Sequence, residues 1–341
     1  MHIPERLNYE KRIKSLLQLD QLIMLLLLVL LCVFFSVTAP NFASKSNIIT
    51  LLRQTSQAGI AAIGMMTVIL LGGIDISIGA YQGVIGALVA TILVATDSVF
   101  WAITAGLLMG TMLGFLTGTI VTKMKLMPLI VTLGMQTILR GAVLIATSGR
   151  SIAISNNEFI QIGKGNIGSV PIPFIIWIVL LFAAWFVLSQ TALGRKIYAI
   201  GGNPNASKLA GLPSNKITMM AYSFCGLMTA LAAIVLAARL TSGQPTAGEG
   251  FEMTVIASVV VGGVSMSGGK GSIFGAMIGV IIFSVLTNGL TMLDINSFWQ
   301  YIIRGAMIII AVYFDERQKD KMNRSIIKAR FAHTEEVKSV E

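Results

Sequence analysis

The chain has 341 residues and a net charge of +10; 55% of the residues are hydrophobic, only 12% are charged, and the mean hydropathy is +0.82. Soluble domains carry about 25% charged residues, so this composition excludes an ordinary soluble protein. Continuous apolar runs of about twenty residues are long enough to cross ~30 Å of hydrocarbon, and they exclude the short alternating segments of an outer-membrane barrel. The chain is therefore predicted to be an all-α polytopic membrane protein.

Ten membrane spans are predicted in chain order. Their approximate ranges are 20–39, 54–72, 78–96, 99–121, 126–147, 173–190, 217–239, 253–265, 272–292 and 298–314. The first span follows a basic segment, as a secretory signal does, but its apolar run Leu22–Val37 is long for a signal and more spans follow, so we expect a retained helix. The glycine-rich joints at 72–78 and 262–272 fit breaks in re-entrant elements equally well, so the number of helices is predicted only as about ten.

The positions of lysine and arginine predict the orientation of these spans. Eighteen of the 25 basic residues fall in the tails and loops of one side, and the positive-inside rule places that side in the cytoplasm. The predicted division is a basic cytoplasmic N-tail at 1–19, a transmembrane domain at 20–314 and a basic cytoplasmic C-tail at 315–341. Because topology explains the charge, we expect contact with membrane lipid and no nucleic-acid partner.

Two short glycine-rich turns share one plan. Residues 72–79 have the sequence GGIDISIG and residues 262–269 have GGVSMSGG, so each turn places polar residues two and four positions after its glycine pair. Two such copies indicate a duplicated element of the kind found in transporters. Asp75, in the first turn, fits two roles that stay open: a gate or path residue inside the membrane, and a carboxylate that caps the following span with help from Ser77.

Spans four and nine carry glycine at strict four-residue spacing. Small residues repeated on one helix face let a neighbouring backbone approach closely inside a membrane. We therefore predict helix-packing roles for Gly106, Gly110, Gly114, Gly118, Gly271, Gly275 and Gly279.

Charged residues near the outer ends of the spans are few. Arg140 lies in the fifth span, and Glu249 and Glu252 lie at the start of the eighth. Two interpretations are open: these side chains reach the headgroups or pair with one another, or they contact a partner on the periplasmic side. The outer loop at 148–172 has a length that suits either a flexible connector or a contact for a soluble extracytoplasmic domain.

The segment 191–216 is a long polar stretch on the predicted cytoplasmic side. Its charged residues, next to the aromatic Tyr198, include Arg195, Lys196 and Lys208. A loop of this length is uncommon unless it serves a function. The sequence at 203–205 predicts a turn or a helix start, and 206–212 predicts one short helix, whose small and apolar face fits a groove in a soluble partner. A plain connector is the alternative.

Motifs for catalysis are missing from the chain. The nearest match to a phosphate-binding P-loop, at 263–272, lacks the first glycine of the pattern and also the Ser or Thr after its Gly-Lys pair. Both histidines lie in the tails, and the sequence contains no serine-centred G-x-S-x-G. We therefore predict no catalytic residue, no metal site and no cofactor in this chain.

Five segments together resemble the permease family of ribose-, xylose-, arabinose- and autoinducer-type ABC importers. They are GGIDISIG at 72–79, MPLIVTLGM to LRG at 127–141, TALGRKIYAIGGNPNASKLAGL at 191–212, EMTVIASVVVGGVSMSGGKGSIFGA at 252–276 and TNGL at 287–290. Each segment alone is a weak signal, but the five occur in family order across about residues 50–290 and together are highly specific.

The resemblance implies a permease of the bacterial inner membrane that works with a separate ABC ATPase, a periplasmic sugar-binding protein and a second permease copy, identical or related. ATP and Mg²⁺ then belong to the ATPase. The resemblance also makes 191–216 the ATPase-coupling loop, with contacts from Gly194, Arg195, Tyr198, Gly201, Gly202, Asn203, Ala206 and Gly211. Sugar hydroxyls need polar groups along a path, and the candidates are Asp75, Ser77, Ser265 and Asn288.

The predicted function is import of a monosaccharide, a ribose-like pentose or a hexose, by alternating access that the separate ATPase drives. The alternatives are a stand-alone secondary sugar carrier or channel, whose transport would survive loss of the ATPase, and a scaffold or receptor subunit without transport. The sequence does not specify which sugar is carried or whether the permease pairs with itself.

Overall fold

The computed structural model describes residues 22–296, 298–303, 305–307, 309, 310, 313 and 317. The predicted N-tail at 1–19 lies outside these residues, as does the C-tail at 315–341 apart from one position. The last predicted span, 298–314, is described in part.

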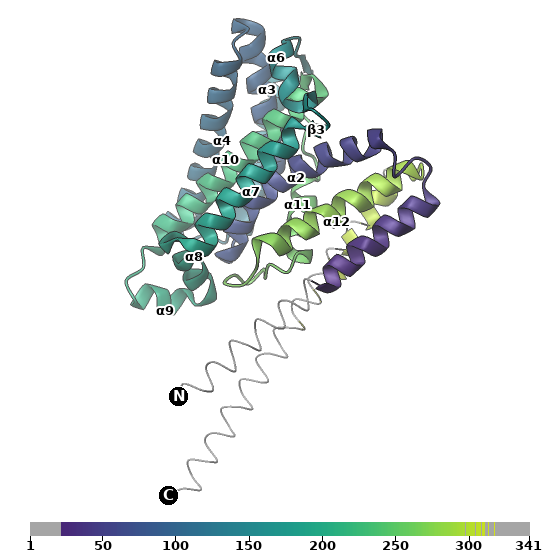
Figure 1. Cartoon of the computed structure of the whole chain (residues 1–341). Coiled ribbons are helices and arrows are strands. Elements are labelled where there is room, and N and C mark those ends of the chain that lie inside the picture. Colours follow the sequence, from purple (N-terminus) through teal and green to yellow (C-terminus); the bar gives the residue numbers. More distant parts are fainter. Residues whose placement is uncertain are drawn as a thin grey trace, which may run out of the picture.

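Long helices cross one another in a bundle, with α6 at one end and α8 and α9 at the opposite end (Figure 1). We call these the α6 end and the α8–α9 end. An apolar helix at Leu22–Thr38 comes first. The helices after it are α2 (Lys45–Leu70), α3 (Ile78–Thr96), α4 (Val99–Lys123), α5 (Pro128–Thr147), α6 (Asn157–Lys164), α7 (Ile172–Gln190), α8 (Ala192–Gly202), α9 (Pro204–Leu209), α10 (Ser214–Leu240), α11 (Phe251–Val261) and α12 (Ile273–Met292).

The helices begin and end at local sequence signals. The side chains of Ser98 and Asn156 accept hydrogen bonds from N–H groups in the first turns of α4 and α6. α5 begins at Pro128, where the missing N–H has no intrahelical partner to lose. Three helices end at a residue with left-handed backbone conformation, and these residues are Asp97, Ser148 and Thr241.

The predicted outer loop at 148–172 is folded onto the bundle. Within it β1 (Ile152–Ala153) pairs antiparallel with β4 (Ser242–Gly243), and β2 (Asn166–Ile167) pairs antiparallel with β3 (Val170–Pro171). α6 lies between them and buries Phe159 completely. The segment is therefore an ordered cover over the α6 end, and the flexible connector that the sequence left open is not what forms.

Six helices in the described part of the chain are long and apolar enough to cross a membrane: α3, α4, α5, α7, α10 and α12. Their bounds fall close to the predicted spans. Helix Leu22–Thr38 corresponds to the predicted span 20–39, and the predicted span 54–72 is part of the longer helix α2. The prediction of a full span at 253–265 was wrong, because α11 has 11 residues, which reach only about 16 Å.

α10 lies at the centre of the bundle, where it packs against α4, α2 and α3. The glycines of α4 allow this contact: a side-chain carbon on Gly110 would lie 2.5 Å from the carbonyl oxygen of Gly226, and one on Gly114 would overlap the carbonyl of Tyr222. The other two members of the stripe also face packed neighbours, and they are Gly106 and Gly118. The four-residue spacing thus presents one face of α4 to α10.

α12 packs against α11 in the same way, through glycines that allow close contact with the neighbouring backbone. Side-chain carbons on Gly275 and Gly279 would overlap the carbonyls of Gly262 and Ser258. Gly271, just before α12, has φ 150°, and it lies against Val264.

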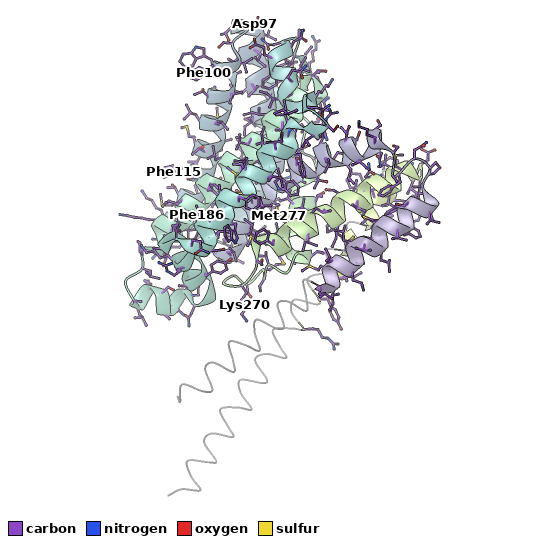
Figure 2. The ribbon with its side chains drawn as sticks, in the orientation of Figure 1. Asp97, Phe100, Phe115, Phe186, Lys270 and Met277 are labelled. Atoms are coloured by element: carbon purple, nitrogen blue, oxygen red, sulfur yellow. The ribbon has the colours of Figure 1, made fainter. Side chains whose placement is uncertain are left out.

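The outer helices expose apolar side chains to their surroundings. Figure 2 shows Phe115 and Phe186 pointing away from the ribbon of the bundle, and these rings are 51% and 57% exposed. Further exposed apolar residues on α4, α5 and α7 include Leu108, Met112, Ile138 and Phe182. Exposed apolar surface of this extent on long helices is suited to contact with hydrocarbon. α3 and α10 are instead mostly buried in the interior.

Candidate functional site

The polar segment 191–216 is folded as two short helices. The side chain of Thr191 caps α8, and that of Asn203 caps α9 by accepting a hydrogen bond from the N–H of Ala206 at 2.9 Å. The hydroxyl of Ser207 donates to a backbone carbonyl of α8 at 2.9 Å and ties α9 back onto α8. The two helices therefore form one unit that projects from the bundle at the α8–α9 end (Figure 1).

α9 presents an apolar side chain to solvent. It ends at Leu209, three residues before the end of the predicted helix 206–212, because Gly211 has φ 73°, a left-handed conformation that glycine adopts readily. Leu209 is 90% exposed. The exposed neighbours on the same unit include Arg195, Lys196, Ala206 and Lys208. An exposed leucine among cations on a short helix is suited to a groove on a partner protein.

Three glycine-rich segments meet beneath this unit. We call this contact the glycine junction, and its members are Leu70–Gly72, Gly201–Gly202 and Gly268–Gly269. The amide of Gly269 donates to the carbonyl of Leu70 at 2.8 Å. A side-chain carbon on Gly201 would overlap that carbonyl and lie 2.6 Å from the Gly269 nitrogen, and one on Gly268 would lie 2.8 Å from the nitrogen of Gly72. The end of α8 thus touches the backbone at the end of α2, just before the first turn, and the backbone of the second turn.

Tyr198 adds a second link between α8 and the second turn. Its hydroxyl donates to the carbonyl of Gly271 at 3.0 Å. Burial raises the pKa of Tyr198, because the low-dielectric surroundings disfavour the phenolate. The phenol therefore stays protonated at neutral pH and keeps its role as donor.

The first turn encloses Asp75. One carboxylate oxygen accepts hydrogen bonds from the Ser77 N–H, at 3.0 Å, and from the Ser77 hydroxyl. Asp75 therefore forms an Asx turn just before α3, whose N-cap residue Ser77 makes no side-chain capping hydrogen bond. The other oxygen of Asp75 is buried and has no partner among the described residues. Nearby, the hydroxyls of Tyr81 and Thr117 share a hydrogen bond of 2.9 Å.

The chain between α10 and α11 runs as irregular backbone beside α3. Glycines of both segments face each other along this contact. Arg140 of α5 donates from one nitrogen to the carbonyls of Pro245, at 2.6 Å, and Ala247, at 3.0 Å. Non-helical backbone at membrane depth needs such partners because lipid supplies none. Arg140 therefore stabilises the irregular segment between α10 and α11.

The two acids near Arg140 differ in their surroundings. Glu252, which is 5% exposed, accepts a hydrogen bond from the side-chain amide of Gln136 at 3.2 Å. Glu249 is exposed. Arg140 and Glu252 are thus bonded to elements of this chain, and Glu249 presents its carboxylate outward.

The structure brings only some of the path candidates together. Asp75 and Ser77 lie in the first turn, and Ser265 lies in the second, where its hydroxyl is 3.0 Å from that of Ser267. Asn288, near the far end of α12, exchanges two hydrogen bonds of 2.9 Å with Asn47 of α2. Asn288 is therefore in a separate place from the other three.

Sequence reasoning missed several polar residues inside the spans. Tyr222 of α10 is 1% exposed, and its hydroxyl lies against the first turn near Gly73. Gln57 of α2 donates to Gln82 of α3 at 3.1 Å. The available signal was a polar side chain within an apolar run, which is costly and marks a pathway or a partner.

The described residues contain no group of three His, Cys, Asp or Glu side chains placed to hold a metal ion. The chemistry that the arrangement does offer is hydrogen bonding, from buried hydroxyls, amides and carboxylates, together with close contact between glycine backbones. Such groups recognise and hold a polar molecule.

Comparisons with known proteins agree on the class of protein. A family described as "Branched-chain amino acid transport system / permease component" matches residues 47–312. The ribose import permease protein RbsC of Haemophilus influenzae is 41% identical over 84% of this chain and 90% of its own length, and that of Bacillus subtilis is 40% identical over 85% and 91%. The L-arabinose transport system permease protein AraH of Escherichia coli is 34% identical over 90% and 93%. No solved structure matches the chain.

Proposed function

The chain belongs to this family of ABC importer permeases and is a multi-pass inner-membrane protein, and on that premise we propose that it carries a monosaccharide, a ribose-like pentose or a hexose, into the cell. The family description names amino acids, but the named relatives at 34–41% identity are ribose and arabinose permeases. Their agreement over most of the chain favours a sugar.

The α8–α9 end faces the cytoplasm in this proposal. Basic residues gather there on the α4–α5 connection, on α8 and α9 and in the second turn, where Figure 2 labels Lys270. The positive-inside rule assigns that end to the cytoplasmic side. The ordered cover of α6 and the short strands then faces the periplasm, where a sugar-binding protein delivers its ligand.

The observation that carries the proposal is the contact of the α8–α9 unit with the end of α2 and with the second glycine turn. A separate ATPase subunit binds the exposed face of α8 and α9 around Leu209, and ATP and Mg²⁺ belong to that subunit. Because the end of α8 abuts Leu70 and Gly269 without intervening side chains, a displacement of α8 moves the end of α2 and the second turn with it. Close packing transmits such shifts because there is no space to absorb them.

Alternating access then follows from differential binding. The ATPase dimer in its nucleotide-bound and nucleotide-free states favours different positions of the α8–α9 unit, and only that difference in affinity shifts the permease between conformations. The permease breaks no bond itself. Asp75 and Ser77 lie where the first turn meets α3, and they are the polar groups that this motion displaces first.

The second permease copy covers the face of α5. Gly134 and Gly141 have open space around them, and the exposed Glu249 lies just beyond Ala247, which Arg140 of α5 holds. An exposed carboxylate at membrane depth is costly against lipid. A protein partner or a water-filled path satisfies it, so we place the path between the two copies.

Reconstitution tests the proposed function. The permease is purified with its ATPase, placed in proteoliposomes and supplied with the sugar-binding protein and labelled D-ribose or L-arabinose. Sugar accumulates only when ATP and the ATPase are both present. Accumulation by the permease alone would show a secondary carrier and reject the proposal, and a complex that hydrolyses ATP normally without moving any sugar would reject the substrate class.

A further inference from the structure

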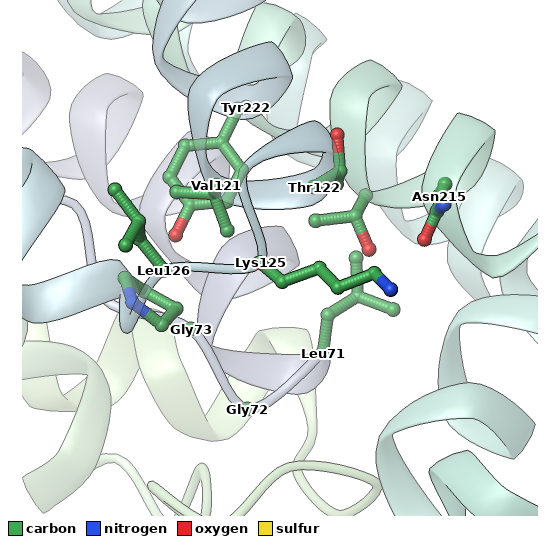
Figure 3. Close-up of a pocket in the computed structure, with 11 residues that line it drawn as sticks. Leu71, Gly72, Gly73, Val121, Thr122, Lys125, Leu126, Asn215 and Tyr222 are labelled. Atoms are coloured by element: carbon green, nitrogen blue, oxygen red, sulfur yellow. The ribbon is translucent and has the colours of Figure 1, made fainter.

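A cavity of about 330 Å³ opens at the α8–α9 end (Figure 3). It lies between the first glycine turn, the connection from α4 to α5 and the first turns of α10. Its polar lining consists of Thr122, Lys125, Asn215, Thr218 and Tyr222, and its apolar walls include Leu71, Val121, Leu126 and Pro128. Ligand sites for small molecules typically combine such apolar walls with a few placed polar groups.

A buried hydroxyl in this lining has no partner. Tyr222 is 1% exposed, and its hydroxyl makes no hydrogen bond within the described part of the chain. The hydroxyl lies against the first turn, where a side-chain carbon on Gly73 would be 2.8 Å from it. Buried polar atoms nearly always have partners, and each one left without a partner calls for an explanation. A ligand hydroxyl in the cavity provides that partner.

The lining offers both donors and acceptors. The Thr122 hydroxyl already donates to the carbonyl of Gly118 at 2.8 Å, so toward the cavity its oxygen acts as an acceptor. The ammonium of Lys125 only donates, and in Figure 3 it extends across the space toward Asn215, whose amide does both. A polyol uses both kinds of group. A phosphate-like anion accepts at most of its oxygens and leaves the Thr122 oxygen without a donor.

We infer that this cavity is a monosaccharide site at the cytoplasmic mouth of the permease, where the sugar is held before release. The inference rests on the proposed function for its orientation and substrate class. Asn215 and Thr218 belong to the first turns of α10, which begins directly after α9. A shift of α9 therefore reshapes the cavity, and sugar in the cavity in turn biases the position of the coupling unit, because coupling between two sites is reciprocal.

The test is protection of an introduced cysteine in the complete complex. Thr218→Cys is made in a Cys32→Ser, Cys225→Ala background and alkylated with a membrane-impermeant maleimide in nanodiscs, with D-ribose, L-arabinose, inorganic phosphate or no addition. Ser151→Cys, in the exposed outer loop away from the cavity, is the matched control, and Thr122→Cys is a second reporter. Sugar at about ten times its Kd is expected to slow alkylation at the cavity cysteines roughly tenfold and to leave the control unchanged.

Two further variants assign the effect to the cavity. Tyr222→Phe and Asn215→Ala, each added to Thr218→Cys, are expected to abolish protection by sugar. Equal alkylation with and without sugar, equal protection at position 151, or protection by phosphate as strong as by sugar overturns the inference. ATP-driven uptake by the parent complex is measured in parallel. If the parent complex takes up sugar but sugar does not protect the cavity cysteines, the sugar site in the cavity is rejected and the proposed function stands. If the parent complex shows no ATP-driven uptake, the proposed function is rejected.

Discussion

Replacing Gly201 with alanine is expected to break the contact between the α8–α9 unit, which is proposed to bind the ATPase, and the rest of the permease. The added carbon would overlap the Leu70 carbonyl and lie 2.6 Å from the Gly269 nitrogen, whereas relaxed contacts of carbon lie at about 3.5 Å or more. α8 must therefore withdraw by roughly 1 Å. Overpacking of this kind costs about 1–3 kcal/mol, and a coupling free energy of that size corresponds to about 5- to 150-fold in activity.

Gly202 is the matched control for this substitution. It also lies in α8, but a side-chain carbon there would be 4.0 Å from its nearest neighbour, an ordinary contact. Both substitutions carry the same gain in helix propensity, about 1 kcal/mol, so only the clash distinguishes them. Sugar uptake and ATP hydrolysis are measured in proteoliposomes. Gly201→Ala should lose uptake while its ATPase still turns over, and uptake of Gly201→Ala equal to that of Gly202→Ala would refute the reasoning.

Three further substitutions test separate contacts. Leu209→Ser removes the apolar tip of α9 and is expected to lower the amount of ATPase that co-purifies by about tenfold or more, without a change in Tm. Gly114→Ala overpacks the α4–α10 contact and should destabilise the folded protein by about 1–3 kcal/mol. Gly141→Ala, with open space around it, should instead stabilise the protein by up to about 1 kcal/mol through helix propensity; equal thermal stabilities in detergent would contradict this. Asn288→Ala leaves the buried side-chain oxygen of Asn47 without its donor, while the Asn47 amide nitrogen keeps the carbonyl of Phe42. The expected cost is about 1–3 kcal/mol, and adding Asn47→Ala should cost less than the sum of the single changes; additive losses would show that the pair does not interact.

Most span positions were predictable because the spans are long apolar runs with clear ends. Pro128 and Asp97 mark helix boundaries that the sequence places within two residues of the structure. The start of α2 was not predictable from hydropathy, because Asn47, Arg53 and Gln57 make its first half polar. Partners distant in sequence stabilise that half: Asn288 bonds Asn47, and the carbonyl of Lys164 accepts from Arg53. Apolar patterning carries no information about such pairs.

The broken span at α11 was hidden for a related reason. Its apolar run is long enough in sequence to suggest a helix over 253–265, yet the helix ends at Val261 and the chain before Phe251 stays irregular. Irregular backbone at this depth is stable only because Arg140, more than a hundred residues earlier, donates to its carbonyls. A short stretch of sequence around α11 does not include Arg140. The glycines therefore suggested that the helix is interrupted, but the sequence did not show where.

The candidate site was predictable in its parts and unpredictable in its assembly. The cationic segment 191–216 and the family motifs pointed to the unit that is proposed to bind the ATPase, but neither placed the end of α8 against Leu70 and the second turn. The two glycine-rich turns, at 72–79 and 262–269, resemble each other in sequence because they pack against each other. Gly72 and Gly268 face each other across a gap that excludes a side chain, and Gly201 enters from α8. Gly201 and Gly268 leave no room for a side chain, and the left-handed backbone of Gly72 (φ 77°) favours glycine, so the glycine content of these segments follows from the joint through which the ATPase is proposed to act.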